Sequence, residues 1–195
     1  MGRLFGVDIL LNVWFLALLG VWALFGGIHA LGLIVTVFLC VLLHEFGHVF
    51  MGRRFGIRCD TILLTPFGGL ALMDFNENAN NYSSWREFCV AIAGPLVNVA
   101  LALLAIAMGW KTLLVINASL FIFNMIPAYP MDGGRIFKSI LANFLTYRKT
   151  CKVAGAVGMA MGALIGMVCL YNLAFMGVLV GYMVVGWAYD EYKRN

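Results

Sequence analysis

Long apolar segments dominate this chain and restrict it to folds that lie in a lipid bilayer. An α-helix needs about 20 apolar residues to cross the hydrocarbon core. Segments near this length cover residues 9–28, 31–52, 87–109, 112–129, 153–171 and 173–189. The composition is 63% hydrophobic and only 11% charged, which is too little polar surface to cover a soluble core. The sequence therefore predicts an all-α polytopic membrane protein of about six transmembrane helices, in a single domain over residues 1–195.

The basic residues indicate how this protein is oriented. If the N-terminus is cytoplasmic, twelve of the thirteen Lys and Arg residues fall on the cytoplasmic side, and Lys111 alone lies outside. This asymmetry agrees with the positive-inside rule and predicts that both termini are cytoplasmic. The basic residues are dispersed and form no patch, so the sequence argues against nucleic-acid binding. The net charge of +4 instead suits anionic lipid headgroups of the bilayer.

The pentapeptide HEFGH, residues 44–48, lies inside the second apolar segment. A helix brings residues four apart onto one face, so His44 and His48 can bind one metal ion together. Glu45 then lies beside the metal, where its carboxylate can take a proton from a water molecule. A polar cluster that only holds helices together is the alternative, but it would be costly in lipid without a metal. The motif thus favours peptide hydrolysis within the bilayer.

A catalytic zinc site usually has three protein ligands, so HEFGH needs a third. His29 lies fifteen residues before His44, about 22 Å along a helix, and is expected at the opposite side of the membrane. Asp132 follows the fourth apolar segment at its cytoplasmic end, at a depth similar to that of His44 and His48. A carboxylate near a membrane segment usually marks function. We therefore expect Asp132 to complete the metal site.

Asp132 belongs to the stretch NMIPAYPMDGGR, residues 124–135. Pro127 and Pro130 cannot continue a regular helix, and unwound backbone inside a membrane is tolerated mainly around a site. Gly133 and Gly134 are expected to let the chain turn tightly after the carboxylate. The alternative is an ordinary helix end with Asp132 as a surface carboxylate.

These motifs, with AGPLVN at residues 93–98, resemble the site-2 protease family of intramembrane zinc metalloproteases, peptidase family M50. The PFGG stretch at residues 66–69 and the layout are most similar to the bacterial sporulation branch, whose members cleave a membrane-associated pro-sigma factor. The resemblance covers nearly the whole chain. It departs from the family in that no PDZ or CBS domain is expected.

The resemblance implies one Zn²⁺ per chain, bound by His44, His48 and Asp132, with Glu45 as catalytic base and then acid. It makes Asn124 a substrate-positioning residue. Asn98 or Asn124 could donate hydrogen bonds to the substrate or to the developing oxyanion, whereas helix–helix hydrogen bonding is the alternative for Asn98. The implied function is regulated intramembrane proteolysis of a membrane-associated substrate, near the cytoplasmic face of a bacterial cell membrane. A regulatory membrane partner or a homo-oligomer is also compatible with the sequence.

Two segments between the second and third apolar segments have no membrane pattern. Residues 57–75 predict a short β-hairpin or re-entrant loop with Gly68 and Gly69 at its bend. Its edge could pair with an unwound substrate as an added strand, or it could be a plain surface loop. The polar residues 76–87 predict either a gate over the site or a solvated loop.

Gly158, Gly162 and Gly166 form a small-residue face that predicts close helix packing, within the chain or in a homodimer. Two other function classes are compatible with the metal ligands: a catalytically silent scaffold, and a metal transporter or sensor. A transporter tends to line a path with polar residues across the membrane, and the outer half of these segments is almost wholly apolar. Proteolysis is therefore the favoured function.

Overall fold

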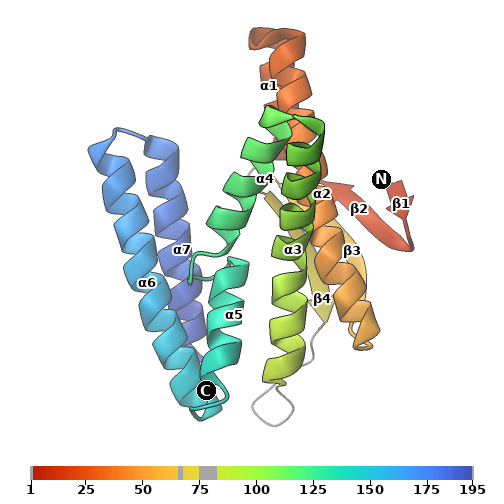
Figure 1. Cartoon of the computed structure of the whole chain (residues 1–195). Coiled ribbons are helices and arrows are strands. Elements are labelled where there is room, and N and C mark those ends of the chain that lie inside the picture. The colour runs from red at the N-terminus through yellow and green to blue at the C-terminus, as the bar shows by residue number, and fades with distance from the viewer. Residues whose placement is uncertain (1, 66–67, 75–82, 195) are drawn as a thin grey trace. The chain divides into compact units, whose positions relative to one another are not determined.

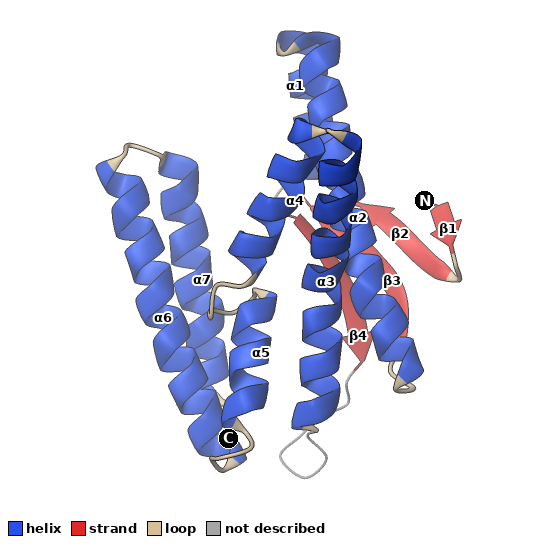
Figure 2. Ribbon diagram, in the orientation of Figure 1, coloured by secondary structure: helices blue, strands red, loops and turns tan. Residues whose placement is uncertain are grey.

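The computed structural model describes residues 2–65, 68–74 and 83–194, which form four strands and seven helices (Figures 1 and 2). The strands are β1 (Gly2–Leu4), β2 (Val7–Leu11), β3 (Arg58–Thr65) and β4 (Gly68–Asp74). The helices are α1 (Val13–Phe25), α2 (Gly27–Arg54), α3 (Ser84–Met108), α4 (Lys111–Asn124), α5 (Asp132–Leu141), α6 (Tyr147–Tyr171) and α7 (Phe175–Lys193). Most of the polar stretch 76–87 lies outside the described residues.

The chain divides into two compact units. The first comprises residues 1–76 and 93–121, and the second comprises residues 77–92 and 122–195. The sheet and α2 belong to the first unit, and α5, α6 and α7 belong to the second.

Three of the described helices, α2, α3 and α6, are long and apolar enough to cross a membrane. Helices α1 and α4 are apolar but have only 13 and 14 residues, about 20 Å each. Helix α1 begins four residues later than the sequence predicted, because Asn12 caps it by accepting a hydrogen bond from the Trp14 amide at 2.8 Å. Helix α4 ends at Asn124, just before the proline-rich stretch, instead of continuing to residue 129.

The four strands form one sheet in the order β1-β2-β3-β4. Strands β3 and β4 are antiparallel, which confirms the hairpin predicted over residues 57–75, while β2 runs parallel to β3. The predicted bend is wrong in detail. Gly68 and Gly69 lie in β4, where they pair with Thr65 and Leu64, because the strand pairing extends to the first residue of β4.

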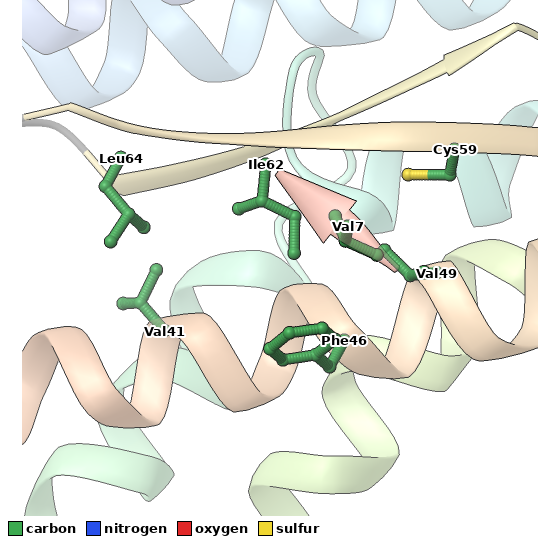
Figure 3. Close-up of a cluster of buried hydrophobic side chains, with 7 residues drawn as sticks. All are labelled: Val7, Val41, Phe46, Val49, Cys59, Ile62 and Leu64. Atoms are coloured by element: carbon green, nitrogen blue, oxygen red, sulfur yellow. The ribbon is translucent and has the colours of Figure 1, made fainter. Parts of the chain in front are cut away.

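The core of the first unit lies between the sheet and α2. Ile62 and Leu64 of β3 and Val7 of β2 face Phe46 and Val49 of α2 (Figure 3). These side chains are at least nine-tenths buried. Phe46 lies between the two HEFGH histidines in sequence and Val49 follows the second. This packing therefore fixes the rotation of α2 about its axis and the directions in which the histidines point.

In the second unit, α6 and α7 run side by side (Figure 1). The predicted small-residue face of α6 makes this contact. A Cβ added at Gly158 would lie 2.9 Å from the Ala188 Cβ, and one added at Gly162 would lie 2.9 Å from a Val184 methyl. The prediction that this face packs within the chain is confirmed at both positions, because any larger side chain would force the two helices apart.

Candidate metal centre

His44 and His48 lie one turn apart on α2, and each is only 4% exposed. Their Nε2 atoms are 3.1 Å apart, and the two rings meet edge to face. Both nitrogens therefore point at one small volume, as two ligands of a single metal ion must. The helical spacing that predicted this pair is realised in the structure.

Both imidazoles pack closely against the backbone of α3, because residue 94 is glycine. A Cβ added at Gly94 would lie 2.6 Å from Nε2 of His44 and would also overlap Nε2 of His48. A Cβ added at Gly47 would lie 2.8 Å from the Ala93 carbonyl oxygen, so glycine at that position lets α2 and α3 approach closely. The two imidazoles thus occupy the place that a side chain at position 94 would need, so glycine there lets both Nε2 atoms come together against α3.

Asn98 of α3 forms a hydrogen bond with Nδ1 of His44, the ring nitrogen that does not face His48. Its Oδ1 lies 2.5 Å from Nδ1 of His44, and its side chain is fully buried. A ligand histidine commonly donates its other ring N–H to such an acceptor, which orients the ring and leaves Nε2 for the metal. The amide nitrogen of Asn98 donates to Asn117 at 3.0 Å. Both ends of the amide are thus engaged, which supports the helix–helix alternative for Asn98 over contact with substrate.

Glu45 lies at the edge of the sheet. Its side chain is 8% exposed, and Oε2 accepts a hydrogen bond from the Ala71 amide of β4 at 3.0 Å. A Cβ added at Gly69 would lie 2.6 Å from Cγ of Glu45. Glycine at the start of β4 therefore lets this strand approach the carboxylate. This close approach, and not a bend, explains why residue 69 of the PFGG stretch is glycine.

Asp132 is the first residue of α5 and is 6% exposed. The predicted tight turn after it is wrong, because Gly133 and Gly134 continue α5. A Cβ at Gly134 would lie 2.6 Å from the carbonyl carbon of Ala128, and one at Gly133 would overlap the carbonyl of Met125. The two glycines let the first turn of α5 pack on the proline-rich segment before it.

Helix α5 is anchored to α7 by a buried ion pair that the sequence did not indicate. Lys138 Nζ lies 2.9 Å from Oε1 of Glu191, and their side chains are 3% and 2% exposed. Arg194 also pairs with Glu191, at 3.2 Å. Burial lowers the pKa of Lys138, but the negative charges of Glu87 and Glu191 outweigh this and raise it above its ordinary value of 10.5. The helix that carries Asp132 is therefore held to α7 by a lysine that stays charged at neutral pH.

His44 and His48 belong to the first unit and Asp132 belongs to the second, and all three side chains are buried. That Asp132 completes the metal site stays a prediction. Two imidazoles and a carboxylate, with a fourth position left for water, are a ligand set typical of catalytic zinc. Asn124 is the last residue of α4 and is half-buried. Its role as a substrate-positioning residue stays a prediction.

Comparison with known proteins shows the family of this chain. The model of peptidase family M50 matches residues 32–110 and 106–169. The chain is 30% identical to a zinc metalloprotease of Methanocaldococcus jannaschii, over 97% of the chain and 59% of that protein. It is 27% identical to stage IV sporulation protein FB of Bacillus subtilis, over 94% of the chain and 65% of that protein.

A putative zinc metalloprotease of Synechocystis is 32% identical, over 94% of the chain and 57% of that protein. The chain thus spans between 57% and 65% of the length of these three relatives. Among solved structures, it matches the site-2 protease from Methanocaldococcus jannaschii with a TM-score of 0.75 and 28% identity, over all of this chain and 95% of that one. The chain belongs to peptidase family M50.

Proposed function

We propose that this protein is an intramembrane zinc metalloprotease that hydrolyses a peptide bond of a membrane-associated substrate near the cytoplasmic face. The observation that carries the proposal is the pair of Nε2 atoms of His44 and His48, 3.1 Å apart, which glycine at position 94 lets approach α3 together. In this proposal His44, His48 and Asp132 hold one Zn²⁺. When bound, zinc supplies a Lewis acid that polarises the scissile carbonyl and activates a water molecule.

Glu45 acts as the general base and then the general acid. Its carboxylate takes a proton from the attacking water and passes that proton to the leaving amine. The position of Glu45 beside Ala71 supports this role, because a substrate peptide at the edge of β4 would lie next to the carboxylate. Asn124 positions the substrate in this proposal, and Asn98 acts on His44 instead.

The open edge of β4 is suited to bind an extended substrate. Strand β4 is the last in the sheet order, so among the described residues no strand pairs with its other edge. The Ala71 amide points to this edge, since it donates to Glu45 and not to β3. The backbone N–H groups of a strand point to alternate edges, so the amide of Gly69, two residues before Ala71, points to the same edge. A substrate strand added here would expose its carbonyls, which a helix hides in its own hydrogen bonds.

We further propose that the chain crosses the membrane about six times within one domain, with both termini in the cytoplasm of a bacterial cell. The distribution of basic residues supports this topology, and helices α2, α3 and α6 are long enough to cross. A membrane-associated pro-sigma factor is the proposed type of substrate, since a sporulation protein is among the relatives.

Two experiments test the proposal. In the first, the purified protein is mixed with a tagged candidate pro-sigma substrate and should cleave that substrate. A zinc chelator should abolish cleavage, and added zinc should restore it. Cleavage that persists through complete zinc removal would overturn the metalloprotease assignment.

Strand pairing is tested separately with photo-crosslinkers at Leu70 and Leu72, which are 51% and 49% exposed on β4. In a Glu45→Gln background both should capture substrate, whereas Leu39, 55% exposed on α2, serves as the control position. Equal capture at all three positions would argue against pairing at β4.

A further inference from the structure

A chain of buried amides runs through the first unit from α4 to His44. Asn117 of α4 and Asn98 of α3 are both fully buried and joined by a hydrogen bond of 3.0 Å. Asn98 in turn contacts Nδ1 of His44. An asparagine in the middle of an apolar helix is costly unless its polar atoms are used. Asn117 has no part in the mechanism above, so its presence there needs an explanation.

A backbone carbonyl fixes the orientation of Asn117. One terminal atom of its amide lies 2.9 Å from the carbonyl oxygen of Leu113. A carbonyl oxygen only accepts hydrogen bonds, so this atom must be the NH₂ nitrogen. The same nitrogen also faces Sγ of Cys40 at 3.4 Å. The oxygen of Asn117 is therefore the atom that faces Asn98.

The orientation of Asn98 follows from that of Asn117. The atom of Asn98 that meets the Asn117 oxygen must be its own NH₂ nitrogen, because two oxygens would repel. The oxygen of Asn98 then faces Nδ1 of His44 at 2.5 Å, and Nδ1 must carry the hydrogen. A neutral imidazole protonated on Nδ1 has its lone pair on Nε2. That is the atom that faces Nε2 of His48 beside Gly94.

We propose that Asn117 is a positioning residue that holds His44 in its metal-binding tautomer by fixing the amide of Asn98. Without Asn117, the Asn98 amide is free to turn over and present its nitrogen to Nδ1. His44 then carries its hydrogen on Nε2, where it blocks the metal. The inference rests on the proposed zinc site, but it makes a claim about the metal-free protein that is independent of proteolysis.

The tautomer can be read directly in metal-free protein by ¹⁵N NMR of labelled histidines. The chain has only three histidines, and a His29→Gln variant helps assign them. His44 should be protonated on Nδ1 in the wild type and should become a mixture of tautomers in Asn117→Leu. Asn172→Leu is the control for loss of the local bond alone, because the exposed Asn172, just after α6, makes the same bond to a carbonyl four residues earlier, at 2.8 Å. A wild-type His44 protonated on Nε2 overturns the proposal without any variant.

A second test uses zinc affinity, measured by competition with a chelator. Asn117→Leu should bind zinc about 10–100-fold more weakly than the wild type, as is usual when a ligand's supporting partner is lost. In an Asn98→Asp background the same substitution should cost nothing or improve binding. A carboxylate accepts from Nδ1 in either orientation, and the Asn117 oxygen would repel it.

Equal losses of affinity in the two backgrounds would show that Asn117 acts only through packing, and would overturn the proposal. If the tautomer and affinity behave as expected but no substrate is cleaved, the proposed function fails and this inference stands.

Discussion

Replacing Gly94 by Ala tests most simply whether the space between His44 and His48 is a metal site. The added methyl would lie 2.6 Å from Nε2 of His44, whereas ordinary contacts begin at 3.4 Å. The imidazole must therefore move by about 0.8 Å, and His48 must move as well. A misplacement of about 1 Å at a catalytic site can cost about 100-fold. We expect zinc affinity and kcat/KM each to fall by about two orders of magnitude.

The assay compares zinc affinity by chelator competition with the thermal unfolding of zinc-free protein. Overpacking of this size costs about 1–3 kcal/mol of stability, so the variant should still fold. Gly32→Ala on α2 is the control, because a Cβ there meets nothing within 4 Å. If Gly94→Ala binds zinc as tightly as Gly32→Ala, the ion does not sit where these histidines point, and the reasoning is refuted.

Three further predictions concern the second unit. Lys138→Met removes the ammonium group that lies 2.9 Å from the buried carboxylate of Glu191, so it should lower the free energy of unfolding by about 3 kcal/mol. The double variant Lys138→Met/Glu191→Leu should recover most of this loss, and a further loss would contradict the charge argument. Because the folded pKa of Lys138 is raised above 10.5, the stabilisation by this pair should be complete below pH 10.5 and should disappear as the pH rises through the folded pKa. A loss near neutral pH would contradict the assignment. Gly181→Ala places a methyl 2.6 Å from the Gly166 amide nitrogen and should lower the free energy of unfolding by about 1–3 kcal/mol. Gly186→Ala is the control, because a Cβ there meets nothing within 4 Å. Equal unfolding midpoints for the two variants would refute close packing of α6 and α7.

The close approach of His44 and His48 could be predicted because it is local in sequence. His44 and His48 are brought together by one turn of helix, which the sequence spacing states directly. The hairpin of β3 and β4 could also be predicted, since its strands are neighbours in sequence. By contrast, β2 pairs in parallel with β3, about fifty residues away, and a five-residue apolar strand at the start of a helical segment gives no signal of its own.

The supporting residues were harder to predict because their partners lie on other helices. Lys138 resembles any cytoplasmic basic residue in sequence, yet it is buried against Glu191 of α7. Gly133 suggested a turn, since close packing and tight turns use the same residue. Asn117 carried a usable signal, as a lone amide within an apolar segment, but which partner it serves depends on how α2, α3 and α4 pack.

The central claim is that Glu45 performs chemistry at a zinc ion held by this chain. The most direct test measures zinc content and substrate cleavage for wild type and Glu45→Gln, purified side by side. The account predicts one zinc per chain in both proteins, with cleavage in the wild type and none in the variant. Cleavage by Glu45→Gln at the wild-type rate, or a wild-type protein that cleaves without zinc, would contradict it.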